Sequence, residues 1–221
     1  MVSKRTTPPT LSDDALAIDA HYSERWSAPL ESIRMSRGRI DELPSEFCVQ
    51  VRRHPDGMMV YATRCMSQPD DESRLELHMF GRSDEVNRDG FVELLTVTAH
   101  FHRTVARLGL HHSVNFSAPR CWDADSLCTY GVVSLPYLDG PSLEWLDAPR
   151  VRFLWLIPIT IEEREFKIAH GMDALEERFE QSGFNFLNPR RPSVILILRA
   201  TCCWVKEHAH WLRMFNRAGL R

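Results

Sequence analysis

Several features that identify common protein classes are scarce or absent in this sequence. Lysine supplies only three of the 27 basic residues, and the arginines are spread along the chain, so no basic stripe for nucleic acid is visible. No stretch of 18 apolar residues occurs, so we expect no membrane-spanning helix. The first ten residues contain no apolar segment, and we expect no secretory signal. No phosphate-binding loop, dinucleotide-binding glycine motif, nucleophile elbow, zinc-protease motif or EF-hand loop occurs.

The composition that remains is that of an ordinary globular domain. The 221 residues are 43% apolar and 26% charged, with a net charge of −3. A chain of this length buries enough apolar surface to fold without disulfides or metal, and its six cysteines are irregularly spaced. We therefore expect a cytoplasmic protein with a disordered tail over 1–10 and a single domain over 11–221.

Apolar periodicity and turn signals predict mixed helices and strands. The predicted helices cover about 13–26, 90–108, 161–170, 172–182 and 204–215. The predicted strands cover 47–51, 58–62, 75–80, 113–116, 127–136, 151–159 and 193–198. Strands and helices do not alternate strictly, so the predicted fold class is α/β (α+β), a mixed β-sheet flanked by helices.

Local signals fix several boundaries of these elements. Ser12 is the predicted cap of the first helix, and Gly109 is the predicted end of the second. Thr160 and Glu163 have the spacing of a capping box. The nearly continuous apolar run Val151–Ile159 is predicted to lie in the centre of the sheet, with ladder pairing ending at Pro158.

The sequence contains no convincing catalytic or metal site. Its close histidine pairs and its adjacent cysteines lack the spacing of a chelating motif: His100/His102, His111/His112, His208/His210 and Cys202-Cys203. We predict no catalytic residue, no metal and no cofactor. A small hydrolase or transferase with an unrecognised Cys/Ser–His site stays open as the alternative, because such partners can be distant in sequence.

Charge patterning indicates a binding surface instead. Residues 121–149 contain five carboxylates and no lysine or arginine, and aromatic side chains lie among them. The predicted partner-binding residues are Trp122, Tyr137, Asp139, Glu144 and Asp147, and the predicted partner is a protein, in one version a basic one. The alternative is that these carboxylates and the basic residues of 188–221 are solvated rims that partly neutralise each other.

An ordered series of motifs resembles the suppressor of fused (SUFU) family. In chain order they are Gly131–Tyr137, Glu144–Leu146, Val151–Thr160, Glu162–Phe166, His170–Glu176 and Arg191–Val194. The likeness is strongest across about 130–195 and is to the bacterial, single-domain branch. The segment 196–221 departs from the family pattern.

The resemblance implies a fold and a class of function. SUFU-like domains are mixed α/β folds that bind proteins and have no known catalytic centre. Animal members clamp an extended peptide of a transcription factor, and bacterial members are proposed to be immunity proteins. The resemblance therefore implies a non-enzymatic protein-binding domain, in one version an immunity protein that neutralises a toxin. A structural subunit of a homo-oligomer is a further alternative.

Overall fold

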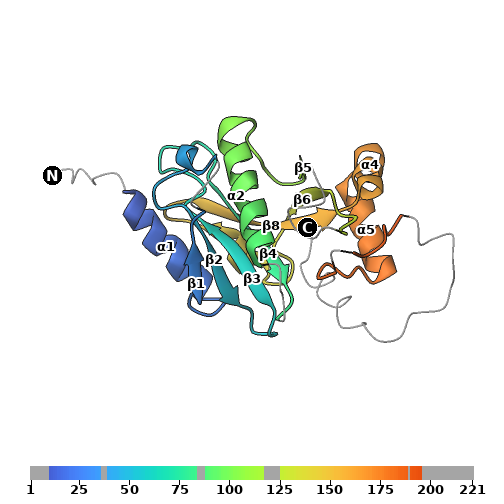
Figure 1. Ribbon diagram of the computed structural model, residues 1–221, viewed down its shortest axis with the longest axis horizontal. Coiled ribbons are helices and arrows are strands. Elements are labelled where there is room, and N and C mark those ends of the chain that lie inside the picture. Colours follow the sequence, from blue (N-terminus) through green and yellow to red (C-terminus); the bar gives the residue numbers. More distant parts are fainter. Residues whose placement is uncertain (1–9, 36–38, 84–87, 117–124, 189, 196–221) are drawn as a thin grey trace, which may run out of the picture.

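The computed structural model describes residues 10–35, 39–83, 88–116, 125–188 and 190–195, and shows one sheet covered on both faces (Figure 1). The helices are α1 (Leu11–Ser23), α2 (Arg88–Thr104), α3 (Pro141–Glu144), α4 (Ile161–His170) and α5 (Met172–Ser182), with a 3₁₀ turn at Arg39–Glu42. The strands are β1 (Glu31–Ile33), β2 (Cys48–Arg53), β3 (Met59–Arg64), β4 (Leu75–Gly81), β5 (Ser113–Asn115), β6 (Tyr130–Ser134), β7 (Trp145–Leu146) and β8 (Val151–Ile159).

The sheet is mixed, which confirms the predicted fold class. Its strand order is β1-β2-β3-β4-β8-β6-β5, and β7 pairs with β8 beside this series. The pairing of β4 with β8 is parallel, and the other described pairings are antiparallel. The apolar run 151–159 lies in the middle of the sheet, as predicted. The ladder continues beyond Pro158 to Ile159, which is opposite Tyr130, so the predicted end at Pro158 is wrong.

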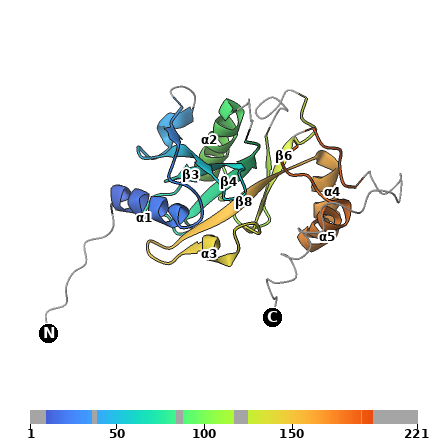
Figure 2. The ribbon, with the colours of Figure 1, turned by 90° about the horizontal axis from the view of Figure 1, so that it is seen from below.

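Alternate residues of β8 supply two separate apolar cores. Phe153, Trp155 and Ile157 pack with residues of α1 and α5 on one face of the sheet. Leu154 and Leu156 pack with residues of α2 on the other face. Figure 2 shows α2 on one side of the sheet and α1 and α3 on the opposite side. Full burial of each such side chain contributes about 1.5–3 kcal/mol.

The first helix begins earlier than predicted because a different residue caps it. The Thr10 hydroxyl accepts a hydrogen bond from the Asp13 amide, and the Asp13 carboxylate accepts one from the Thr10 amide. This capping box places the start of α1 at Leu11, so Ser12 lies inside the helix. The helix ends at Ser23, three residues before the predicted end.

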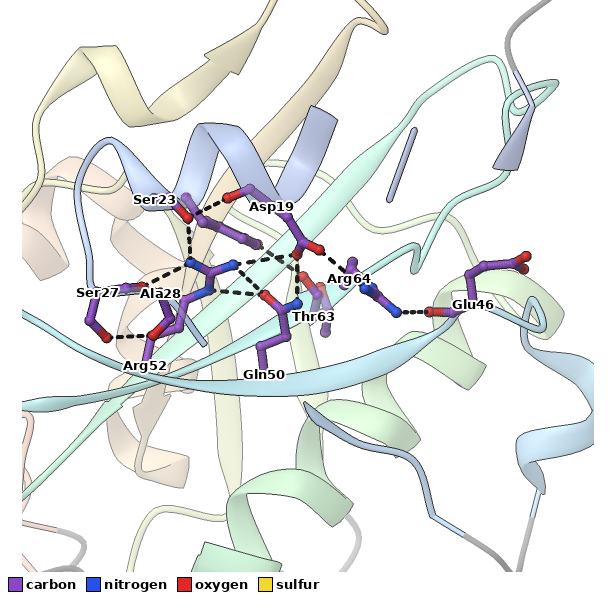
Figure 3. Close-up of polar contacts among 10 residues, drawn as sticks. Asp19, Ser23, Ser27, Ala28, Glu46, Gln50, Arg52, Thr63 and Arg64 are labelled. Atoms are coloured by element: carbon purple, nitrogen blue, oxygen red, sulfur yellow. Dashed lines mark hydrogen bonds and ion pairs between the residues drawn. The ribbon is translucent and has the colours of Figure 1, made fainter. Parts of the chain in front are cut away.

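A buried polar network fixes α1 to the sheet (Figure 3). Arg52 on β2 is fully buried and donates to the side chain of Gln50 at 2.7 Å and to the Ser27 carbonyl at 2.9 Å. Asp19 on α1 accepts from Gln50 at 2.6 Å and forms an ion pair with Arg64 on β3 at 3.1 Å. Because a buried guanidinium is costly without partners, this network specifies where α1 lies on the sheet.

Other boundaries also differ from the predictions. The second helix ends at Thr104 rather than at 108, and the Ala106 amide already donates five residues back, to the Phe101 carbonyl, so the helical hydrogen-bond pattern has stopped there. Strand β6 is shorter than the predicted strand 127–136. Residues 193–195 are not part of a strand, and Val194 and Ile195 lie in a turn. The rest of that predicted strand, with the helix 204–215, lies outside the described residues.

The joint between β8 and α4 confirms the predicted capping box. The Thr160 hydroxyl accepts from the Glu163 amide at 3.3 Å, and the Glu163 carboxylate accepts from the Thr160 amide at 2.9 Å. The same buried carboxylate pairs with Arg191, whose guanidinium also donates to the Pro158 carbonyl at 3.0 Å. Glu163 therefore connects the start of α4 to the described residues that follow α5.

Candidate functional site

A shallow groove lies where the end of α2 and the loop after it face α4, next to strand β5, which is at one end of the strand order. Its volume is about 430 Å³. Its basic and imidazole lining side chains are Arg107, His111, His112, Arg164 and Lys167. Its main apolar lining side chains are Phe101, Leu108 and Ile168. Within the described part of the chain, no carboxylate lines this groove.

Hydrogen bonds from two directions hold the loop after α2 in place. The buried His102 ring accepts a hydrogen bond from the Leu108 amide at 2.9 Å. Asp71 pairs with Arg103 at 2.8 Å and with Arg107 at 3.0 Å. Burial alone raises the pKa of Asp71, but hydrogen bonding and the two guanidinium groups together hold it below its usual value. Arg107 is therefore positioned on the groove by a carboxylate that it shares with Arg103.

Lys167 on α4 forms the opposite wall of the groove. Its ammonium group donates to the Ser113 hydroxyl at 2.7 Å and to the His111 carbonyl. Burial lowers the pKa of Lys167, and the neighbouring Arg164 lowers it further. His111 has a positive φ of 67°, and its amide donates to the Val133 carbonyl at 2.7 Å. The contact with Lys167 therefore joins α4 to the segment that leads into β5.

One exposed aliphatic side chain lines the groove, and a second directly precedes a lining residue in the sequence. Val105 is 65% exposed and directly precedes the lining residue Ala106, and Ile168 is 59% exposed on α4. The guanidinium of Arg164 lies over the ring of Tyr130, with its central carbon 4.9 Å from the ring centroid. Apolar contact area and positive charge therefore occur together at this groove.

Comparison with known families decides the membership of the chain. The family model described as "Suppressor of fused protein (SUFU)" matches residues 48–192, more than half of the 221 residues. The chain belongs to the SUFU family. The matched range includes every lining residue of the groove, and it confirms the resemblance seen across about 130–195.

Solved structures of SUFU proteins share the fold. A putative SUFU homolog from Neisseria gonorrhoeae FA 1090 is 27% identical with a TM-score of 0.70, covering 83% of this chain and 97% of that chain. Drosophila Suppressor of Fused is 14% identical with a TM-score of 0.65, covering 95% of this chain and 54% of that chain, so this chain spans about half its length. A chain of the Sufu–Fu complex is 16% identical with a TM-score of 0.61, covering 88% of this chain and 96% of that chain. No curated protein sequence matches the chain.

In this SUFU-family chain, two of the predicted partner-binding carboxylates contact other residues of the same molecule. The Asp139 side chain is 3% exposed, accepts from the Trp26 indole at 2.7 Å, and faces His54 at 3.4 Å. Glu144 pairs with Arg152 on β8 at 2.7 Å. Of the three predicted carboxylates, Asp147 is the exposed one. Asp125 of the same acidic stretch is 70% exposed and pairs with Arg190.

Of the two aromatic residues predicted to bind a partner, the structure describes only Tyr137. The half-buried Tyr137 donates to Glu176 on α5 at 2.8 Å, and the Ser134 hydroxyl donates to the same carboxylate at 3.0 Å. Burial raises the pKa of Tyr137, and the charge of Glu176 adds to that effect. Tyr137 therefore connects β6 and its following loop to α5. Trp122 lies outside the described residues.

The described cysteines and His102 of this SUFU-family chain have the environment of structural residues. Cys48, Cys65 and Cys128 are buried, and burial raises the pKa of each thiol, which keeps it protonated and a weak nucleophile. Burial also lowers the pKa of His102 to about 4. Within the described residues, no three His, Cys, Asp or Glu side chains are placed to hold a metal ion, and no helix is long and apolar enough to cross a bilayer. The pairs Cys202-Cys203 and His208/His210 lie outside those residues.

Sequence reasoning missed the groove, although part of its signal was visible. In the sequence alone, His111-His112 is a histidine pair without chelating spacing, and Lys167 is one of three lysines. The proximity of these residues depends on the sheet, because β5 carries one wall and the end of β8 leads into the other. No spacing in the sequence encodes that proximity.

Proposed function

We propose that this chain is a non-enzymatic protein-binding domain and that its partner docks on the groove between α2 and α4. The observation that supports this most directly is the exposure of the lining residue Ile168, together with that of Val105, which directly precedes the lining residue Ala106. Exposed aliphatic side chains around a concave site are typical of a docking surface. The three thiols of the described residues, on Cys48, Cys65 and Cys128, are buried and protonated, which favours binding over covalent chemistry at those positions. A SUFU protein in complex with Fu is a precedent within the fold.

One version of this proposal is an immunity role. In that version the partner is a toxin, and the chain neutralises it by forming a tight complex. The expected outcome is that co-expression of the wild-type chain protects cells that produce the toxin of a neighbouring gene, and that a stable complex is purified. Failure to bind or to protect would remove the immunity version and leave the binding role intact.

The experiment that tests docking at the groove uses matched pairs of exposed aliphatic residues. The groove variant is Val105→Ser with Ile168→Ser. The control variant is Leu16→Ser with Leu30→Ser, whose side chains are 70% and 56% exposed near α1, at the end of the molecule opposite α4 (Figure 1). Circular dichroism establishes that both variants are folded.

Tagged wild-type and variant chains are used for affinity capture from the native organism, with quantitative mass spectrometry. We expect one protein to be enriched by the wild type and by the control, and to fall at least about tenfold with the groove variant, since about 1.4 kcal/mol of lost contact is a tenfold change. Equal recovery with all three chains, or no recovery with the wild type, would refute docking at the groove. Recovery of the chain itself alone would make it a subunit of a homo-oligomer.

A further inference from the structure

We infer that the partner segment bound in the groove is acidic, with a carboxylate that pairs with Lys167 and aliphatic side chains that contact Val105 and Ile168. This inference rests on the proposed function, because it describes the partner of the same groove. It reverses the sign of partner charge that the acidic stretch 121–149 suggests. The basis is the charge of the lining and the hydrogen-bonding capacity left on one lysine.

The lining of the groove carries more positive charge than its neighbours neutralise. Arg107, Arg164 and Lys167 contribute three cations. Arg107 shares the single carboxylate of Asp71 with Arg103, so two positive charges are balanced by one negative charge. A partner that supplies a carboxylate here would neutralise part of this excess positive charge without placing like charges together.

Lys167 is the cation with the greatest capacity for a new partner. Its ammonium group has three donors, and the described contacts use two of them, both with neutral acceptors. No carboxylate of the described residues forms an ion pair with it. A carboxylate adds the attraction of opposite charges to its hydrogen bond with this partly buried ammonium, so an incoming carboxylate gains more than a neutral amide does.

The remaining polar groups of the lining agree with an acidic occupant. Arg164 pairs with its chain neighbour Glu165, whose side chain is largely exposed, and such a surface pair is weak and easily exchanged. His112 accepts a hydrogen bond from the Gly109 amide at one ring nitrogen, which leaves the other nitrogen to donate.

The apolar rim favours a protein over a nucleic acid. A phosphate backbone is bound by extended rows of basic residues, whereas this groove has three cations among apolar side chains and the whole chain has a net charge of −3. The exposed Val105 and Ile168 match aliphatic side chains and offer nothing to a phosphate. The expected occupant is a short segment in which Asp or Glu alternates with Leu, Ile or Val.

The test is selection from a phage library of random 12-residue peptides on the immobilised full-length chain. We expect the selected peptides to be enriched in Asp and Glu beside aliphatic residues. Their binding should be lost with Val105→Ser/Ile168→Ser and retained with Leu16→Ser/Leu30→Ser. The best peptide is then synthesised with Glu or Asp, and again with Gln or Asn at the same positions, and titrated by fluorescence polarisation.

Three variants separate charge from structure in that titration. Lys167→Gln should weaken binding of the acidic peptide about tenfold or more and change binding of its amide counterpart little. Lys167→Arg keeps the charge and should stay within about threefold of the wild type. Ser113→Ala removes a contact of Lys167 without changing any charge and should also stay within about threefold. Raising the salt concentration should weaken binding of the acidic peptide to the wild type.

The outcomes distinguish this inference from the proposed function. Groove-dependent peptides that are neutral or basic, or an unchanged affinity in Lys167→Gln, would overturn the acidic partner while docking at the groove stands. Peptides that bind all variants equally would overturn docking at the groove itself. Tighter binding of a single-stranded oligonucleotide than of the selected peptide, lost in Lys167→Gln, would overturn the assignment to a protein.

Discussion

At the scale of single residues, Glu76 makes the stability of the fold depend on pH. Its buried carboxylate accepts hydrogen bonds from the Thr63 hydroxyl at 2.6 Å and the Met66 amide at 2.9 Å. Burial raises the pKa of Glu76 to about 7, against the lowering effect of these hydrogen bonds. The folded pKa lies above the unfolded one, so this group's contribution to stability is full at low pH and is lost as pH rises through about 7.

We expect Glu76→Gln to remove this loss of stability, because the neutral amide keeps a hydrogen-bonding group in the same place. The free energy of unfolding of the variant minus that of the wild type should therefore increase by on the order of 3 kcal/mol between about pH 4 and pH 8. Urea denaturation at several pH values measures this. The control is Glu93→Gln, an exposed residue of α2, whose pH profile should parallel the wild type. A parallel profile for Glu76→Gln would contradict the buried titration.

Asp139 and Asp147 lie in the same acidic stretch and have opposite environments. Asp139→Ala leaves the buried indole N–H of Trp26 without its acceptor, so we expect a loss of about 1–3 kcal/mol in the free energy of unfolding. Asp147→Ala at the exposed site should stay within about 0.5 kcal/mol of the wild type. Chemical denaturation compares the two. Equal effects would show that Asp139 is not the internal acceptor that its geometry indicates.

At the scale of elements, Gly131 allows strand β6 to pack against its neighbours. A Cβ atom at this position would lie 2.4 Å from the ring of Phe116 and 2.8 Å from the side chain of Leu156. Both neighbours are buried in the core under α2, so neither moves without disturbing it. We expect Gly131→Ala to lower the free energy of unfolding by about 1–3 kcal/mol. Gly109→Ala, with open space around the added atom, is the control and should have a far smaller effect in thermal denaturation.

Two variants at the joint before α4 distinguish the contribution of the helix cap from that of the buried ion pair. Thr160→Ala removes one cap hydrogen bond and should cost about 1 kcal/mol. Glu163→Ala also leaves the buried Arg191 without its carboxylate, and such losses cost about 3–5 kcal/mol. Urea denaturation of both variants gives the comparison. Equal losses would mean that Arg191 finds another partner and that the pair does not hold the residues after α5.

Elements with strong local signals were predictable from the sequence. The strand 151–159 and the helix 172–182 match their predicted bounds, because continuous apolar character and the Gly183 stop are local features. The sequence predicts Ser12 as the cap of α1, whereas the reciprocal hydrogen bonds between Thr10 and Asp13 make Thr10 the cap. The short strands β1 and β7 carry little pattern of their own and depend on pairing with longer neighbours.

At the scale of the whole molecule, the candidate site could not be predicted because it depends on contacts between distant segments. The sequence shows that the stretch 121–149 is acidic, but it does not show that Trp26 donates a hydrogen bond to Asp139 or that Arg152 forms an ion pair with Glu144. Likewise, Lys167 and Ser113 are 54 residues apart and meet only when the sheet brings α4 to β5. Local patterning therefore predicts elements, whereas the binding surface follows from the topology.

The shared sheet also predicts how the whole molecule unfolds. Strand β8 gives Phe153 and Trp155 to the core under α1 and Leu154 to the core under α2, so neither core persists without this strand. We therefore expect one cooperative transition, with the same urea midpoint for backbone circular dichroism and for tryptophan fluorescence. Gly131→Ala, a change on the α2 side, should lower both midpoints equally, although Trp26 and Trp155 lie on the α1 side. Separate midpoints would show that the two faces fold as independent units, and the sheet would then not couple the groove to the core beneath α1.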